Sequence, residues 1–253
     1  MLRHVLSVLV LVALVPRASA AQTVDELLAK NFAAKGGLEK IRAVQTMRLA
    51  GSMPVGPKQQ ADFVMEMKRP NQMRMDFTFG SNTVTQAFDG KIGWQLLPPP
   101  PAPDRSAVPA TGRPQPQVMP AEALKDLEAQ ADMDGPLVDY QAKGHKVEYV
   151  GREKVEGTDT YVLKVTLKTG DVRRIYLDAE QYLEIRSEGK SRGPDGREVE
   201  IETLIGDYRE VGGLMLPHSH ESGLKGSPEK RKMTIQKIEI NVPVDDARFK
   251  MPK

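Results

Sequence analysis

Apolar and polar side chains alternate along most of the chain, which is the pattern of β-strands that bury one face. Short turns rich in Gly, Asp and Pro separate the alternating runs. Strands joined by short turns usually pair with their sequence neighbours, so we expect an antiparallel meander. A sheet of this length must curl or close. The predicted strands lie near 45–52, 60–68, 72–79, 82–88, 92–97, 145–151, 160–168, 171–178, 182–190, 197–208, 213–221 and 229–241.

Helical spacing replaces this alternation near the N-terminal end, where we predict a helix from Val24 to Lys35. Thr23 is the expected N-cap, and Glu26 three residues later completes a capping box. Gly36 and Gly37 follow, and glycine is the residue that most often ends a helix. Residues 38–43 can add a further turn.

A proline-rich stretch from Pro98 to Pro120 interrupts the strands and holds nine of the nineteen prolines. Such a sequence favours extended polyproline II structure and is not expected to join a sheet. It is either a linker between domains or a loop that crosses the mouth of the sheet. The next segment, 121–133, favours the second interpretation, because it predicts a short amphipathic helix that needs a surface to cover. Its apolar positions are Ala123, Leu124, Leu127 and Ala131, and Gly135-Pro136 ends it.

These elements predict a mainly β fold with a helical lid (α+β). We expect a curved antiparallel sheet that forms an incomplete β-barrel, covered by two or three short helices. The lid comprises the proline-rich loop and the helix, residues 98–135.

The first twenty residues have the features of a secretory signal peptide. Arg3 and His4 precede an apolar run from Val5 to Val15, and Ala18-Ser19-Ala20 forms a cleavage pattern. We therefore predict a signal peptide over 1–20 and one soluble domain over 21–253, exported to the periplasm. The sequence has no cysteine for a disulfide or a lipid anchor. No later segment approaches the roughly 20 apolar residues of a membrane span.

The charge balance argues against nucleic acid as a partner. Removing residues 1–20 takes away Arg3 and Arg17 and no acid, so the 36 basic residues become 34 against 34 acidic ones. Binding to nucleic acid needs a concentrated basic surface. A neutral chain with scattered charges does not supply one.

The most specific motif is Lys68-Arg69-Pro70-Asn71, a turn between two alternating runs. Pro70 suits a strand end because it cannot donate a ladder hydrogen bond. Arg69 is a permanent cation beside an apolar face. Further along the chain come Asp89-Gly90-Lys91 and then Trp94. The apolar residues of the flanking runs are Phe63, Met65 and Met67 before the turn, and Met73, Met75, Phe77 and Phe79 after it.

This arrangement resembles the LolA/LolB-like family of periplasmic outer-membrane lipoprotein carriers. The segment 244–252, Val-Asp-Asp-Ala-Arg-Phe-Lys-Met-Pro, is similar to the end of that family's sequences. The resemblance implies a curved sheet, a helical lid and a hydrophobic cavity for acyl chains. It also implies that Arg69 hydrogen-bonds the lid when the cavity is empty and releases it on loading. The implied partners are a lipid or acylated lipoprotein and inner- or outer-membrane lipoprotein-sorting proteins.

Methionine usage supports a cavity independently, because six of twelve methionines lie between Met47 and Met75. Flexible thioether side chains suit a surface that adapts to variable apolar ligands, although they also fill irregular cores. Phe88 and Trp94 can line the same space or pack in the core. The predicted ligand-binding residues are Arg69, Phe63, Met65, Met67, Met73, Met75, Phe77, Phe88 and Trp94, and the predicted lid residues are Leu124 and Leu127.

Catalytic and metal-binding interpretations have little support in the sequence, and we predict no enzyme activity, metal or cofactor. There is no cysteine nucleophile and no Gly-x-Ser-x-Gly or phosphate-binding glycine motif. His218 and His220 share a strand face, but a zinc site needs further ligands such as His145 or Glu221. The acidic residues Glu198, Glu200, Glu202, Asp245 and Asp246 are interpreted as solvated. The favoured function is an exported lipid or lipoprotein carrier. The alternatives are an envelope sensor or regulatory module on the same fold and, third, a hydrolase.

Overall fold

A computed structural model describes residues 22–56, 59–98, 115–192 and 197–252. The predicted signal peptide and most of the proline-rich stretch therefore lie outside the described residues. The described chain forms thirteen strands in one antiparallel sheet. The strands are β1 (Thr46–Gly56), β2 (Gln59–Lys68), β3 (Gln72–Phe79), β4 (Asn82–Phe88), β5 (Gly93–Leu96), β6 (Pro116–Val118), β7 (Lys146–Val155), β8 (Thr158–Thr166), β9 (Val172–Asp178), β10 (Glu184–Arg192), β11 (Glu198–Val211), β12 (Leu214–Leu224) and β13 (Arg231–Ile240).

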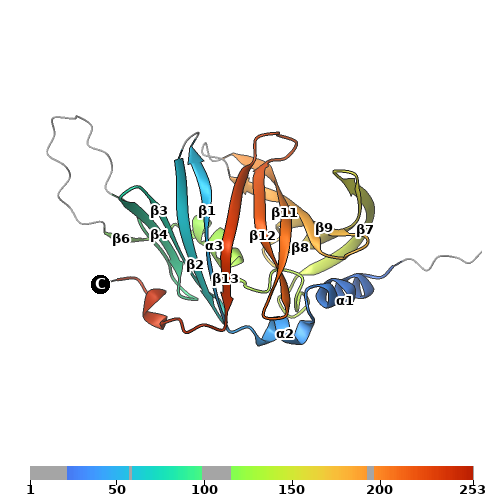
Figure 1. The fold of residues 1–253 in the computed structure, drawn as a ribbon, viewed down its shortest axis with the longest axis horizontal. Helices are drawn as coiled ribbons and strands as arrows, with labels where there is room; N and C mark the ends of the chain where they lie inside the picture. Colours follow the sequence, from blue (N-terminus) through green and yellow to red (C-terminus); the bar gives the residue numbers. More distant parts are fainter. Residues whose placement is uncertain (1–21, 57–58, 99–114, 193–196, 253) are drawn as a thin grey trace, which may run out of the picture.

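The strand order confirms the meander within each half of the chain. β1 to β6 follow one another across one half of the sheet, and β7 to β13 do so across the other. The two halves join where β1 pairs with β13, for example Met47 with Ile240 and Leu49 with Ile238. The sheet ends at β6 on one side and at β7 on the other, so it stays open (Figure 1). The predicted fold, a curved antiparallel sheet that forms an incomplete barrel covered by short helices, is confirmed.

The helices are α1 (Val24–Ala34), α2 (Leu38–Ala43) and α3 (Ala121–Ala131), and a 3-10 turn (Asp246–Arg248) follows the last strand. The capping box of α1 is present as predicted, with Thr23 and Glu26 bonding each other's backbone. Gly36 has a φ of +107° and lies so close to the β11–β12 turn that a Cβ would be 2.2 Å from the Gly213 carbonyl oxygen. Only glycine fits there, and it turns the chain from α1 into α2.

The lid helix ends two residues earlier than predicted. Asp132 follows α3 in an extended conformation, and Gly135 has a positive φ of 71°. The expectation that the proline-rich stretch stays out of the sheet is wrong at its C-terminal end, where β6 pairs with β5. The sheet tolerates Pro116 because it is the first residue of an edge strand, where a missing N–H leaves no bond unmade. Strands on both sides of the stretch belong to one sheet.

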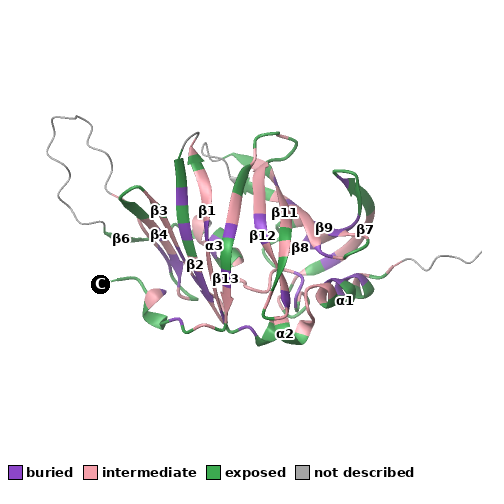
Figure 2. Ribbon diagram, viewed as in Figure 1, coloured by how far each residue is buried: buried purple, intermediate pink, exposed green. Residues whose placement is uncertain are grey.

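Two helices cover the concave face, and each seals a separate apolar core. α1 places Leu27 and Leu28 against Leu163 and Ile175 of the second half. α3 places Leu127 and Ala131 against β2, β3 and β4 in the first half. Buried and exposed positions alternate along the strands, as a sheet with two different faces requires (Figure 2).

The opposite, convex face carries buried ion pairs. Glu66 is 3% exposed, accepts two hydrogen bonds from Arg48 and pairs with Arg248 of the C-terminal segment. The interpretation of Glu202 as solvated is wrong: it is 5% exposed and pairs with Arg186 at 2.5 Å and Lys230 at 3.1 Å. Arg186 comes from the neighbouring strand β10 and Lys230 from the connection between β12 and β13, which the sequence of one strand does not reveal.

Candidate functional site: an apolar cavity under an ion-paired strap

An apolar cavity lies on the concave face where the two halves of the sheet meet. Its volume is about 310 Å³. The β1–β13 pairing builds it, because that pairing brings Met47 and Leu49 beside Ile235 and Ile238. The remaining apolar lining comes from β2, α2 and its end, β12 and the segment after α3: Met67, Ile41, Val44, Leu214, Leu216, Pro217, Met133, Pro136 and Leu137.

Residues 132–137 form the roof of this cavity, and we call the segment 132–142, which follows α3, the strap. Three of its aspartates pair with cations, two with arginines from other elements and one with Lys143, the residue directly after the strap. Asp132 accepts from Lys143 at 2.6 Å, and Asp139 pairs with Arg42. The Arg42 guanidinium, as hydrogen-bond donor, holds the pKa of the Asp139 carboxyl below its usual value. The strap is therefore held by charge-assisted hydrogen bonds and not only by apolar packing.

Arg69 makes the most buried of these pairs. Its Nη1 and Nη2 donate to the two carboxylate oxygens of Asp134, each at 2.6 Å. Its Nε and Nη2 also donate to the carbonyl oxygens of Val44 at 2.5 Å and Ile41 at 3.1 Å. The side chain of Asp134 is only 9% exposed. Arg69 thus ties the strap to the end of α2, and the hydrogen-bonded Asp134 raises the pKa of the guanidinium.

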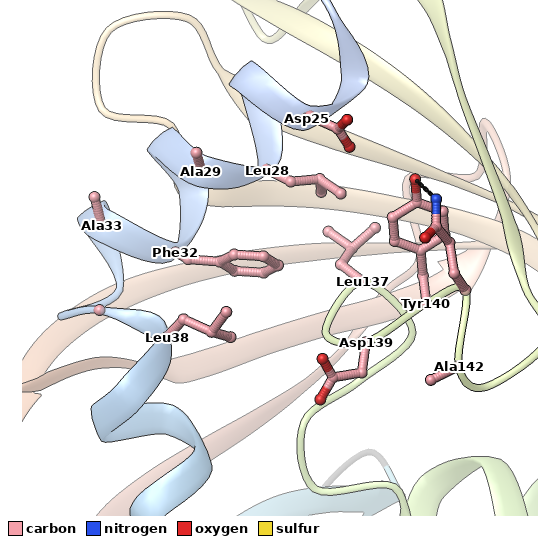
Figure 3. A pocket seen from close by; sticks show the side chains of 12 residues that line it. Asp25, Leu28, Ala29, Phe32, Ala33, Leu38, Leu137, Asp139, Tyr140 and Ala142 are labelled. Atoms are coloured by element: carbon pink, nitrogen blue, oxygen red, sulfur yellow. Dashed lines mark hydrogen bonds between the residues drawn. The ribbon is translucent and has the colours of Figure 1, made fainter.

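Two further hollows share the strap as a wall. One is a groove of about 580 Å³ between α1 and residues 137–142. Figure 3 shows Leu28 and Phe32 of α1, Leu38 of α2 and Leu137 of the strap pointing into it. The other is a more polar hollow of about 290 Å³ behind α3, which shares Asp132 and Pro136 with the apolar cavity.

No protein-family profile matches the sequence, and no curated protein is significantly similar to it. Solved structures do match. A LolA superfamily protein from Nitrosomonas europaea superposes with a TM-score of 0.56 at 14% identity, over 91% of this chain and 98% of that one. This protein has a LolA-like fold. A DUF1329 family protein from Desulfovibrio piger gives 0.55 at 12% identity, over 87% and 95% of the two chains. A putative outer membrane lipoprotein-sorting protein domain from Vibrio parahaemolyticus gives 0.52 at 11%, over 88% and 94%.

Most of the predicted ligand-binding residues share the concave face of this LolA-like sheet. Register places three pairs opposite one another on β2 and β3: Phe63 with Phe77, Met65 with Met75, and Met67 with Met73. Only Met67 among them lines the 310 Å³ cavity. Met73 and Phe88 are covered by Leu127 of α3, and Leu124 packs against the same cluster. The space beneath α3 is therefore filled by the protein's own side chains, and the hollow lies beside it, under the strap.

Trp94 does not belong to this set. It lies in register with Ala87 and Arg74, on the face opposite Met73 and Phe88. Its Nε1 donates to the carbonyl oxygen of Phe249 at 2.7 Å, so the C-terminal segment covers it. The expectation that Trp94 lines the cavity is wrong. The reason is the neighbouring Gly93, where a Cβ would be 2.7 Å from Leu124, so α3 leaves no room for a side chain on the inner face.

Several residues that line the cavity could not be identified from the sequence. Leu214 and Leu216 alternate in a predicted strand, whereas Ile235 and Ile238 are three residues apart because the β1–β13 register shifts between them, and nothing in the sequence shows that β13 pairs with β1. Asp134 carries no signal beyond being one acid among several near a helix end. The structure supplies the missing information by topology, because the strap crosses the sheet at the β1–β13 junction.

The cavity also has polar members. Lys35 donates to Glu184 at 3.1 Å, which closes one end. His220 faces the cavity from β12, and burial lowers the pKa of its imidazole, opposed by Glu184. Among the described residues, no group of three or more His, Cys, Asp or Glu side chains is arranged to hold a metal ion. Nor does any helix in the described ranges have the length and apolar character to cross a membrane.

Proposed function

We propose that this protein is an exported periplasmic carrier, and not an enzyme, which holds an acyl chain of a lipid or lipoprotein in the apolar cavity. The observation that carries the proposal is an apolar hollow roofed by a strap whose buried aspartate is bound by Arg69. The LolA-like fold supports it, and so does the name of the matching Vibrio parahaemolyticus domain, which concerns lipoprotein sorting.

The free energy of burying an acyl chain is large enough to open the strap. A hollow of 310 Å³ has room for roughly ten water-sized groups, and a methylene is of similar size. Burying ten methylenes at about 0.8 kcal/mol each gives about 8 kcal/mol. A charge-assisted hydrogen-bonded pair contributes about 1.5–3 kcal/mol. Chain burial therefore exceeds what the Arg69–Asp134 and Lys143–Asp132 pairs contribute together, about 3–6 kcal/mol on the same scale.

A cavity-filling variant tests the proposal. Leu216→Trp places an indole in the hollow from β12, whereas Leu224→Trp changes the same residue type on the same strand at a 52% exposed position. We expect the first variant to weaken binding of a fluorescent fatty acid at least tenfold and the second to leave it unchanged. Native mass spectrometry after gentle extraction identifies the cargo. We expect bound lipid in the wild type and less bound lipid in Leu216→Trp.

Equal binding by both variants would contradict the carrier. A wild-type protein that is empty of lipid, binds no acyl probe and instead captures an envelope protein would support a regulatory module in its place.

A further inference from the structure

The polar hollow behind α3 differs from the apolar cavity in its lining. It lies between α3, the Arg69–Asn71 turn, and the residues just before β7 and around the β8–β9 turn. Four basic or imidazole side chains line its strand side: Lys143, His145, Lys168 and Arg173. Asp171 on that side accepts a hydrogen bond from the Thr169 hydroxyl at 2.6 Å. The α3 side contributes Lys125 together with the exposed Asp126 and Glu128.

Positive charge is in excess on the strand side. Within the described part of the chain, Lys168 and Arg173 have no acidic side chain at ion-pair distance, whereas Lys143 is engaged by Asp132. His145 lies among these cations, and its Nδ1 accepts a hydrogen bond from the Lys168 backbone N–H at 3.1 Å. The pKa of His145 is lowered, first by burial and then by Lys143, with Lys168 and Arg173 adding to the effect and Asp132 opposing it.

The hollow and the apolar cavity share part of the strap as a common wall. Asp132 and Pro136 line both spaces. Lys143 holds this partition by donating to both carboxylate oxygens of Asp132, at 2.8 and 2.6 Å, and to the Gly135 carbonyl oxygen at 2.8 Å. An anion that enters the polar hollow meets the same ammonium group that fixes the strap.

We propose that the polar hollow receives the phosphate head group of the lipid whose acyl chain occupies the apolar cavity. This inference rests on the proposed function and specifies its ligand as a phospholipid-type amphiphile. The phosphate takes the place of Asp132 on Lys143, and Lys168 and Arg173 supply further donors. Loss of the Lys143–Asp132 pair breaks the link between the two ends of the strap and loosens it, so head-group binding and chain entry favour each other. The acids of α3 face the rest of the head group and suit hydroxyl or ammonium donors.

Two probes with the same chain separate the head group from the tail: myristoyl lysophosphatidylglycerol and myristoyl monoacylglycerol. The test variant is Lys168→Gln/Arg173→Gln. Its charge-matched control is Lys154→Gln/Lys237→Gln, which removes two exposed lysines from β7 and β13. We expect the wild type and the control to bind the phosphate-bearing probe about tenfold more tightly than the neutral probe, and the test variant to lose that preference. Affinity for the neutral probe should be the same in all three proteins.

Equal affinity of the wild type for the two probes would overturn the inference and leave the carrier standing. An equal loss of preference in the control would do the same, because it would assign the preference to net charge. Glycerol phosphate that binds as tightly as the lysophospholipid would show a free-phosphate site and overturn the coupling to the tail. If neither probe binds, the proposed function itself fails.

Discussion

Replacing Arg69 by Met should release the strap without unfolding the sheet. The substitution removes two hydrogen bonds to Asp134 and two to backbone carbonyls of Ile41 and Val44. Removing one partner of a fully buried pair costs about 3–5 kcal/mol. The Arg69 side chain is 22% exposed, so we take about 2–3 kcal/mol for this site. At about 1.4 kcal/mol per factor of ten, local opening of the strap should increase roughly 30- to 150-fold.

Hydrogen exchange followed by mass spectrometry measures this opening directly. Peptides that cover residues 132–137 should lose protection by that factor, whereas peptides from β11 and β12 should exchange as in the wild type. Arg42→Met is the matched control, because the Arg42 and Asp139 side chains are 51% and 41% exposed. Solvent screens such exposed pairs, so the control should change protection less than about fivefold.

Two results would refute the reasoning. Unchanged protection of 132–137 would show that apolar packing alone holds the strap. A uniform loss of protection across the sheet would show that Arg69 stabilises the whole fold and not this one segment.

Three further changes test other parts of the structure. His220→Gln should flatten the dependence of the unfolding free energy on pH. Burial lowers the pKa of His220, so the unfolded chain takes up the imidazole proton before the folded chain does. The stability that this histidine contributes is therefore lost as the pH falls through about 6.5. Chemical denaturation at pH 5.5 and 7.5 measures the difference in unfolding free energy, and an equal pH dependence in the variant and the wild type would contradict the prediction. Trp94→Phe removes the hydrogen bond to Phe249 and should lower the unfolding free energy by about 1–2 kcal/mol while the affinity for an acyl probe stays constant. Weakened probe binding would show that Trp94 lines the cavity after all. Leu137→Ala removes the buried side chain between the cavity and the α1 groove, so it should lower the unfolding free energy by about 2–5 kcal/mol. The enlarged space should also shift the preferred fatty acid to longer chains, and titration with a series of chain lengths tests this.

Local sequence patterns specified the strands well because burial on one face leaves a period of two. The turn at Arg69 and the strands around it lie where the alternation places them, with β2 ending at Lys68 and β3 beginning at Gln72. The capping box of α1 and the apolar stripe of α3 are equally local, and both were predictable. Such signals depend on residues a few positions apart.

The site itself depends on contacts between distant residues. The pairing of Met47 with Ile240 joins segments 193 residues apart, and no local pattern identifies β13 as the partner of β1. The face of Trp94 was equally hidden, because β5 has four residues and its inner face is set by how closely α3 approaches Gly93. The bond between Arg69 and Asp134 likewise spans a stretch whose path the sequence does not define.

The junction of β1 with β13 also has a consequence for assembly of the fold. Each half of the sheet is built from consecutive strands, and apart from the β5–β6 connection their links are short, so each half can form from nearby residues at little entropic cost. The apolar hollow has no walls until the two halves meet along that single pair of strands. The apolar cavity is therefore expected to be the last part of the molecule to take shape, and a break in the β1–β13 ladder would abolish it while leaving both half-sheets their own cores.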